Sequence, residues 1–405
     1  MANKPNIRFK DFTEDWFQKT IGEQLFEINE KNNPKQTDFV VSLTVKDGVI
    51  PYSEKGAVGN RAKEDHTQYK LTYPNTIVLN SMNILIGAIG LCNYYGCVSP
   101  IYYVYRAAEN VCLSFVYRHM SSKRFQKNLR KYGNGILEIR LKVPTEDLMK
   151  RILPAPSEKE QKRIAKCFDD LDKLISQREA ELEKLKNIKR ALLEKLFPQN
   201  REKVPALRFK EFTEEWGEVA LGSIADKVTT KNSSKAYTET FTNSAEHGIM
   251  SQSDFFDHAI ANQENIAGYY IVQENDFVYN PRISKLAPVG PINRNKLGRT
   301  GVVSPLYTVF RPKNVSVEYL EVFFMQNSWN KFMNFNGNSG ARLDRFSISD
   351  AIFWQMPIQY PQIEEQQKTA KLITTLSNLL SLREKQLTLL KHTKQALLEQ
   401  MFVNE

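Results

Sequence analysis

Cysteine is scarce in this sequence, and its spacing excludes the usual cysteine-based sites. The 405 residues include four cysteines, Cys92, Cys97, Cys112 and Cys167, without CxxC pairs or the nearby histidines of a zinc site. Four cysteines are also too few to hold together a chain of this length. We therefore expect buried free thiols in a reducing compartment.

Long apolar runs are missing as well. The longest apolar stretch, residues 77–92, is interrupted by polar residues and is too short to cross a membrane. The first residues, MANKPNIRFKDF, lack the apolar core of a signal peptide. Together these absences predict a cytoplasmic protein.

The sequence also lacks the motifs of common catalytic centres. It contains no GxxxxGK[ST] loop, no GxGxxG after a strand, no HExxH and no GxSxG. It has no Asn/Asp-Pro-Pro-aromatic tetrapeptide of the kind that amino-methyltransferases use around a flipped base. Its five histidines are scattered without metal-ligand spacing. We expect no catalytic residue, no metal and no cofactor in this chain.

Positive charge exceeds negative charge in an otherwise ordinary globular composition. Apolar residues make up 41% of the chain and charged residues 25%. Lysine and arginine number 56 against 46 acidic residues, a net charge of +10. This moderate excess suits a nucleic-acid partner, and it also suits an acidic protein partner.

The two halves of the chain repeat one another. The phrase RFKDFTEDW at 8–16 returns as RFKEFTEEW at 208–216, and further pairs follow in the same order. These pairs are NTIVLN (75–80) with NDFVYN (275–280), CVSPIYYVYR (97–106) with VVSPLYTVFR (302–311), EQKRIA (160–165) with EQQKTA (365–370), and ALLEKLF (191–197) with ALLEQMF (396–402). A repeat of half the chain indicates a duplicated module rather than a solenoid.

Each copy ends in a long amphipathic helix. In residues 156–200, apolar side chains recur at steps of three, four and seven, and Ser157 and Glu160 have the spacing of a capping box. Residues 361–405 repeat the apolar stripe, including Leu372 and Leu379. A helix of this length cannot bury one stripe alone, so we predict that the two helices form an antiparallel coiled coil. Two separate core helices are the alternative.

The remaining segments are rich in beta-branched and aromatic runs separated by Gly, Asn and Pro turns. The predicted fold class is α+β, with two pseudo-symmetric domains at 1–155 and 201–360 joined by the helices 156–200 and 361–405. Between the matched phrases, residues 31–74 and 227–274 share little. That divergence favours two related tasks on different targets, although drift after duplication produces the same pattern.

The duplicated α+β unit, its glycine-containing loop and the approach LPAPSEKEQKRI to the long helix together resemble the specificity subunit of type I DNA restriction-modification systems. The second copy, MPIQYPQIEEQQ, carries the same signature. The resemblance covers essentially the whole chain, in the order recognition domain, helix, recognition domain, helix.

This resemblance implies a non-catalytic subunit whose two target-recognition domains each read one half of a split, double-stranded DNA target. It implies that two methyltransferase subunits, which use S-adenosylmethionine, dock on the helices, and that motor-nuclease subunits using ATP and Mg join the complex for phage defence. A stiff coiled coil would hold the two reading heads at one separation. The rival interpretations are a coiled-coil protein-interaction scaffold and a single-chain DNA methyltransferase.

Candidate DNA-binding residues are those loop side chains that can reach base edges or phosphates. In the first domain they are Lys55, Arg61, Lys63, Asn80, Ser81, Asn83, Lys131, Asn134, Arg140 and Lys142. In the second they are Asn280, Arg282, Lys285, Arg294, Lys296, Arg299, Asn338, Arg342 and Arg345. The basic segment NRNKLGRT, residues 293–300, is the strongest local signal.

Each candidate also has a structural alternative. Lysine and arginine are usually solvated at the surface, and the asparagines after the TIVL and FV strands could be turn residues that bond their own backbone. Arg140 and Arg345 occupy matching places after a glycine loop, which a structural ion pair would also explain. The aromatic residues of the opening phrase, such as Phe9 and Trp16, are predicted to anchor the start of each domain.

Overall fold

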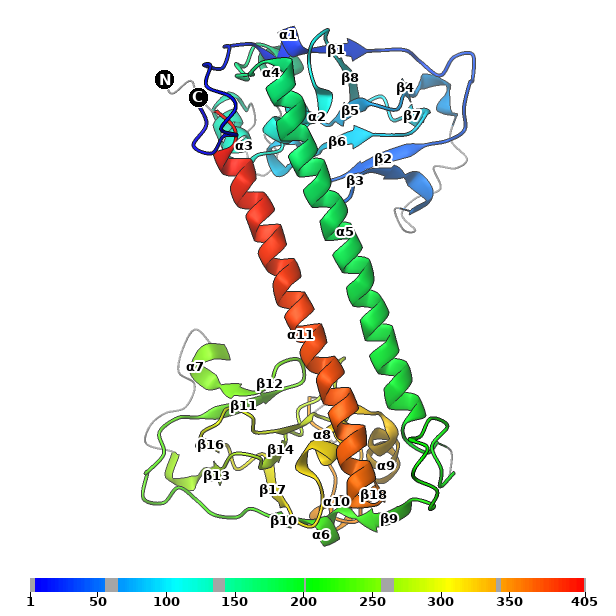
Figure 1. Ribbon diagram of the computed structural model, residues 1–405, viewed down its shortest axis with the longest axis vertical. Helices are drawn as coiled ribbons and strands as arrows, with labels where there is room; N and C mark the ends of the chain where they lie inside the picture. Colours follow the sequence, from blue (N-terminus) through cyan, green and yellow to red (C-terminus); the bar gives the residue numbers. More distant parts are fainter. Residues whose placement is uncertain are drawn as a thin grey trace. The chain divides into compact units, whose positions relative to one another are not determined.

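A computed structural model describes residues 4–54, 65–133, 143–199, 202–255, 266–339 and 344–403. The chain forms two compact units (Figure 1). Unit 1 contains residues 1–180 and 385–405, and unit 2 contains residues 181–384. Each unit therefore combines one α+β domain with a part of each long helix.

The two long helices are α5 (Glu158–Lys195) and α11 (Ile363–Gln400), each of 38 residues. Within unit 1, Lys394 pairs with Asp172 and Lys391 pairs with Glu179. The residue numbers of α11 decrease where those of α5 increase, so the two helices run in opposite directions. Within unit 2, Lys186 lies 3.1 Å from Glu384 and continues the same antiparallel order. The predicted antiparallel pairing of the helices is confirmed.

The apolar stripe predicted for α11 is partly wrong. Leu372 and Leu379 are each 37% exposed, whereas Ile373 is fully buried in the core of unit 2. Apolar residues occur on more than one face of this helix, and a stripe read from one period cannot tell which face meets the domain. The consequence is an apolar outer face on α11.

Each unit contains a four-stranded antiparallel sheet with the same strand order. The strands of unit 1 are β1 (Leu25–Ile28), β8 (Tyr103–Ala107), β5 (Thr76–Leu79) and β6 (Ile89–Cys92), in this order across the sheet. Those of unit 2 are β10 (Ala225–Lys227), β17 (Thr308–Pro312), β14 (Phe277–Tyr279) and β15 (Ile292–Arg294). Val78 pairs with Val104 and Gly90, and Val278 pairs with Val309 and Asn293, so the registers correspond.

Two further strand pairs flank each sheet. In unit 1, β2 (Val41–Thr44) pairs with β3 (Gly48–Pro51), and β4 (Lys70–Thr72) pairs with β7 (Gly96–Val98). In unit 2, β11 (Phe241–Ser244) pairs with β12 (Gly248–Ser251), and β13 (Tyr270–Val272) pairs with β16 (Gly301–Val303). The β2–β3 hairpin turns at Gly48 and the β11–β12 hairpin at Gly248. Their φ angles are +68° and +70°, a conformation that glycine adopts without strain.

Short helices complete the two units. Unit 1 has α1 (Ile21–Gln24), α2 (Leu113–Met120), α3 (Lys123–Leu129) and α4 (Thr145–Met149). Unit 2 has α6 (Leu221–Ile224), α7 (Gln252–Phe255), α8 (Val317–Met325), α9 (Ser328–Asn336) and α10 (Asp350–Phe353), and β9 (Gly217–Ala220) pairs there with β18 (Pro357–Tyr360). The predicted α+β class is confirmed.

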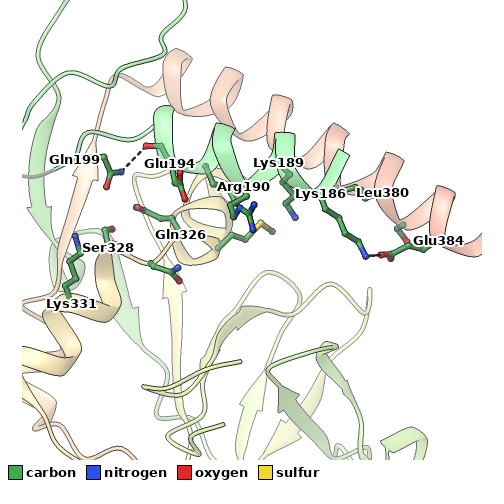
Figure 2. Close-up of a pocket in the computed structure, with 15 residues that line it drawn as sticks. Lys186, Lys189, Arg190, Glu194, Gln199, Gln326, Ser328, Lys331, Leu380 and Glu384 are labelled. Carbon is green, nitrogen blue, oxygen red and sulfur yellow. Dashed lines mark hydrogen bonds and ion pairs between the residues drawn. The ribbon is translucent and has the colours of Figure 1, made fainter. Parts of the chain in front are cut away.

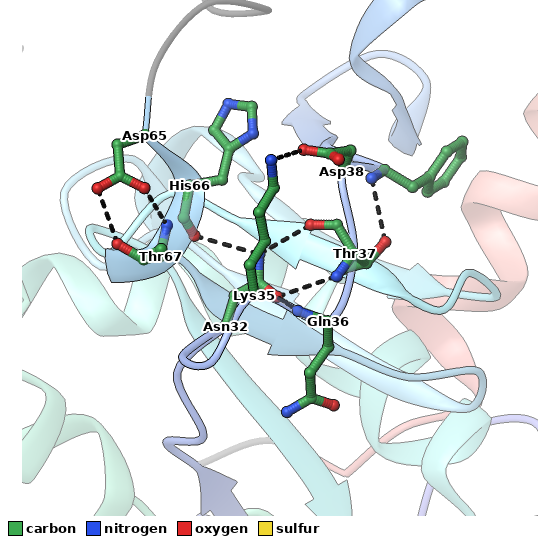
Figure 3. A network of polar contacts seen from close by, with 9 residues as sticks. Asn32, Lys35, Gln36, Thr37, Asp38, Asp65, His66 and Thr67 are labelled. Carbon is green, nitrogen blue, oxygen red and sulfur yellow. Dashed lines mark hydrogen bonds and ion pairs between the residues drawn. The ribbon is translucent and has the colours of Figure 1, made fainter.

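The segments that diverge in sequence nevertheless keep the same local structure, as a buried asparagine shows. The Asn32 side chain donates to the Thr37 carbonyl at 2.8 Å and accepts from the Gln36 amide at 2.7 Å (Figure 3). Asn232 donates likewise to the Tyr237 carbonyl at 2.7 Å. One asparagine therefore shapes the same turn in both units, although most side chains around it differ.

The repeated opening phrase attaches each domain to its long helix. Arg8 donates two hydrogen bonds of 2.7 Å to the carboxylate of Glu160, and Arg208 donates two of 2.8 Å to Glu365. Both glutamates are buried, at the first turn of α5 and of α11. The Trp16 side chain is buried in the core of unit 1, as predicted, whereas Phe9 is only partly buried.

Glu160 thus has a different role from the one its spacing predicts. The capping-box pattern assigns its carboxylate to the backbone at the start of the helix, but both carboxylate oxygens accept from Arg8. The next residue, Gln161, accepts from the Cys112 amide at 2.9 Å and donates to the Pro156 carbonyl at 2.9 Å. Local spacing cannot reveal an arginine 152 residues away in the chain.

The repeated helix ends contribute to the cores of the two units. Phe402, which follows α11, lies 5.4 Å from Phe115 between ring centroids in the core of unit 1. Phe197, which follows α5, lies 5.8 Å from Trp216 in the core of unit 2. The matching phrases ALLEKLF and ALLEQMF are therefore repeated because each fills a hydrophobic core.

The four cysteines are free. Cys92 and Cys97 are buried as predicted, and burial raises the pKa of the Cys97 thiol to about 11. Cys112 and Cys167 are only partly buried.

Candidate nucleic-acid interface

The structure brings two of the predicted regions of unit 2 together. The segment after β14 pairs with the segment after the glycine loop: the Phe346 amide donates to the Pro281 carbonyl at 2.7 Å, and the Ile283 amide to the Asp344 carbonyl at 3.1 Å. As a result Arg282 and Arg345 lie opposite each other in an antiparallel bridge. Asn338 lies on the same loop, in a bridge with Ser347.

Unit 1 joins the corresponding segments. The Val143 amide donates to the Ser81 carbonyl at 3.2 Å, so the turn after β5 meets the end of the first glycine loop. The following candidates lie outside the described residues: Lys55, Arg61, Lys63, Asn134, Arg140, Lys142 and Arg342. Of the remaining first-domain candidates, Asn83 and Lys131 are exposed.

A groove of about 620 Å³ opens in unit 2 beside the paired segments. Its walls are the tip of the β11–β12 hairpin, residues 280–286 and the turn at 304–307. Arg282 and Lys285 line it and are exposed, and Leu286 beside them is 70% exposed. Neither cation has an ion pair within the described residues.

Hydrogen bonds of asparagine side chains connect the segments that line this groove. Asn243 donates to the Val278 carbonyl at 2.6 Å and accepts from the Asn293 side chain at 2.7 Å. Asn280 is buried, donates to the Asn243 carbonyl at 2.9 Å and accepts from the Arg282 amide at 3.0 Å. Asn280 therefore shapes the turn that presents Arg282, because its own polar atoms are occupied.

The matching residues of unit 1 behave in the same way. Asn80 is buried and accepts from the Met82 amide at 3.0 Å, and the Ser81 side chain is buried too. Asn80 therefore has the turn-forming environment that the sequence leaves as the alternative to base contact. Asn243 lies in the divergent segment 227–274 and belongs to no motif, so the sequence alone provides no signal for it, whereas Asn293 is the first residue of the basic segment 293–300.

The basic segment at 293–300 is ion-paired within unit 2. Arg294 lies 2.9 Å from Glu318, and Lys296 lies 2.9 Å from Glu321, both on α8. Arg299 donates two hydrogen bonds of 2.7 Å to Glu239, which lower the pKa of that carboxyl. These cations already have acidic partners, so binding of a polyanion there would have to compete with the ion pairs.

Three repeat positions of this groove carry apolar side chains in unit 1. Met82 stands at the repeat position of Arg282, Ile86 at that of Leu286 and Val45 at that of Ala245. These three unit 1 side chains are 46%, 60% and 55% exposed. The two faces therefore share a backbone frame and differ in chemistry, which is the expectation for two different targets.

Within the described residues, no group of three or more His, Cys, Asp or Glu side chains could hold a metal ion. None of the described helices combines the length and the apolar character needed to cross a membrane.

Comparison with known proteins gives a consistent result. The family model described as type I restriction modification DNA specificity domain matches residues 13–186 and again residues 213–392. No curated protein matches the chain.

Three solved structures are similar over nearly the whole chain. The type I restriction-modification S subunit from M. genitalium has a TM-score of 0.58 at 14% identity and covers 99% of this chain and 100% of its own. The HsdS subunit from Thermoanaerobacter tengcongensis has a TM-score of 0.50 at 15% identity, covering 96% of each chain. A chain from a study of complex assembly and conformational transition of the type I R-M system has a TM-score of 0.54 at 14% identity, covering 96% and 97%. At such identities the likeness shows a shared fold.

Proposed function

The chain belongs to the family of type I restriction-modification DNA specificity subunits, and from this premise we propose that each of its two domains reads one half of a split DNA target. A specificity subunit is not itself an enzyme. The scaffold interpretation without DNA specificity is not supported, and neither is the single-chain methyltransferase.

The groove of unit 2 is the observation that carries the proposal. Arg282 and Lys285 are exposed cations beside a hairpin tip, on a turn held by the buried Asn280. Opposite Arg282, the buried Nε of Arg345 has no hydrogen-bond acceptor among the described residues. Arginine can donate to the guanine edge or to phosphate, so this corner suits a duplex in either contact.

In unit 1 the same corner offers apolar contact. Exposed Met82, Ile86 and Val45 can meet thymine methyl groups in a major groove, and Asn83 and Lys131 are exposed polar candidates of the same unit. The other candidate residues named from the sequence remain predictions.

Arg282 should matter more for DNA binding than Arg299. Arg282→Ala is expected to lower affinity for the cognate duplex by about 1–3 kcal/mol if it reads a base, or to reduce the salt slope by about 1 if it contacts phosphate. Arg299→Ala is the matched control, because Arg299 is held by Glu239. Fluorescence anisotropy across a salt series separates the two cases, and equal losses for both variants would contradict the assignment.

The helices offer two similar apolar patches for docking. In unit 1, Phe9, Cys167, Leu171 and Leu174 line a cavity of about 410 Å³. The repeat positions in unit 2 are Phe209, Leu372, Leu376 and Leu379. Leu174 and Leu379 are both 37% exposed. Two like patches suit two copies of one methyltransferase subunit, which would bring S-adenosylmethionine; ATP and Mg would belong to motor-nuclease subunits.

Each patch should hold one methyltransferase subunit. Leu174→Asp is expected to remove one copy, Leu379→Asp the other, and the double variant both, because an unpaired carboxylate in an apolar interface costs several kcal/mol. Native mass spectrometry of the complex counts the copies. Ser176→Asp, on an exposed position of the same helix, is the control and should retain both. Retention of both copies by Leu174→Asp would exclude this patch.

The proposed function is tested by methylome sequencing. A methylation-free host expresses the chain with its methyltransferase subunit, beside a host with the methyltransferase alone. A gapped adenine-methylation motif that depends on this chain supports the proposal and identifies both half-sites. A confirmed complex that methylates no new motif would overturn it.

A further inference from the structure

A second cavity in unit 2, of about 700 Å³, is separate from the groove that Arg282 and Lys285 line (Figure 2). It is enclosed by the last turns of α5, the middle of α11 and the connection from α8 to α9. Four cations line it: Lys186, Lys189, Arg190 and Lys331. Neither the DNA groove nor the apolar patches account for it.

The equivalent place in unit 1 is closed by the chain's own side chains. Glu399 at the end of α11 accepts from the backbone amides of Lys123 and Arg124, at 3.0 and 3.1 Å, at the start of α3. Lys394 there is paired with Asp172. The helix start and the lysine of unit 1 thus both have carboxylate partners.

In unit 2 the repeat counterpart of Glu399 is Glu194, which lines the cavity but accepts no hydrogen bond from the start of α9 among the described residues. The serine Ser377 replaces the aspartate, so Lys189, at the repeat position of Lys394, has no matching partner on α11. Asn327, the residue before α9, makes no side-chain capping bond. A helix start of this kind attracts a negative charge, because its first backbone amides point outward without acceptors.

A buried side-chain amide beside the cavity lacks a hydrogen-bond partner within the residues that the structure describes. Gln326 lines the cavity and is 7% exposed, and its Nε2 has no hydrogen-bond partner among the described residues. A buried donor without an acceptor is costly, and an oxygen-bearing ligand would satisfy it. Figure 2 places Gln326 beside the cavity with Ser328 and Lys331.

The charge around the cavity also favours an anion. Lys186 is neutralised by Glu384 at 3.1 Å. Lys189 and Lys331 have no ion pair in the described part of the chain, and desolvation by burial lowers the pKa of Lys189. A bound carboxylate would compensate this partly buried ammonium group.

We propose that this cavity binds an acidic peptide segment of the methyltransferase subunit that docks on unit 2, with a carboxylate at the start of α9 between Lys189 and Lys331. The inference rests on the proposed docking of methyltransferase subunits. Apolar Leu193, Met325 and Leu380 in the wall suit a peptide. Because unit 1 fills the equivalent site itself, only one of the two docking ends gains this contact.

Zero-length carbodiimide cross-linking of the assembled complex tests the contact directly, because it joins a lysine amine only to a carboxylate within reach. We expect a cross-link from Lys189 or Lys331 to an Asp or Glu of the methyltransferase subunit. A complete absence of such intermolecular products, with other intermolecular products detected, would overturn the inference.

Charge reversal provides the second test. Lys189→Glu combined with Lys331→Glu should raise the Kd of one bound methyltransferase subunit by about tenfold or more, while Lys184→Glu on the same helix, outside the cavity, should not. Melting curves verify folding. Unchanged partner binding would overturn this inference alone, as would a loss of DNA affinity without loss of partner. If the unmodified chain binds no methyltransferase subunit, the docking proposal is overturned as well.

Discussion

Replacing Arg208 with methionine should destabilise unit 2 by about 3–5 kcal/mol, the cost of removing one partner from a buried ion pair. The side chain of Glu365 is 2% exposed, and its carboxylate accepts two hydrogen bonds of 2.8 Å from Arg208. Without the arginine this carboxylate remains buried and uncompensated at the first turn of α11. The helix start and the domain would separate from each other.

Denaturant unfolding followed by intrinsic fluorescence provides the measurement. Trp216, Trp329 and Trp354 all lie in or against the core of unit 2, so their signal reports this unit. Lys203→Met is the matched control, because Lys203 and Glu215 form a pair in which both side chains are 66% exposed. Removing an exposed pair costs about 0–1 kcal/mol. Similar midpoints for the two variants would contradict a structural role for the Arg208 pair.

Arg8→Met should have the corresponding effect on unit 1. Its partner Glu160 has a side chain that is 1% exposed, and the two hydrogen bonds are 2.7 Å long. Trp16 is the tryptophan of this core. If Arg8→Met lowers the unfolding midpoint reported by Trp16 and leaves the midpoint reported by the tryptophans of unit 2 unchanged, the repeated phrase stabilises each unit separately.

Exchanging residues 201–360 for the matching segment of a relative should replace one half of the methylated motif completely and leave the other half unchanged. Within this chain the exchanged segment carries the whole groove, from the β11–β12 hairpin to the turn at 304–307. Unit 1 keeps its own corner, where Val143 and Ser81 meet. Methylome sequencing of the host is the measurement.

The ion pair between Arg208 and Glu365 limits which relative can supply the exchanged segment. Arg208 lies inside the exchanged segment and its partner Glu365 lies outside it, so the donor relative must have an arginine at that position. Exchange of residues 1–155 is the reciprocal control and should change the other half. A motif in which both halves change, or neither changes, would disprove independent reading by the two domains.

Several features of the fold follow from short-range pattern. The long helices are visible in the sequence because their apolar periodicity is local, and the duplication is visible because matching phrases keep their order. The pairing of the two helices follows from the length of their apolar stripes, which neither helix can bury alone. Which face of α11 is buried does not follow, because Ile373 and Leu372 are neighbours and only the packed domain distinguishes them.

The candidate site was harder than the fold to predict from residue type and spacing. The strongest basic signal, at 293–300, contains arginines and lysines whose acidic partners lie elsewhere in the chain, Glu239 being 60 residues from Arg299. Asparagine is a residue type that reads base edges, yet Asn280 and Asn80 are both buried and shape turns. Exposure and partner choice depend on contacts between distant segments, which residue type and spacing do not encode individually.

By itself the sequence determined that this protein is a duplicated α+β module with two long helices, because repetition and helical period are properties of neighbouring residues. It also led to the family, through the order of its phrases. Only the tertiary structure decided which of the candidate cations have acidic partners within their own unit. Arg282 and Arg299 are the same residue type, but folding brings the carboxylate of Glu239 to Arg299, whereas Arg282 has no ion pair in the part of the chain that the structure describes.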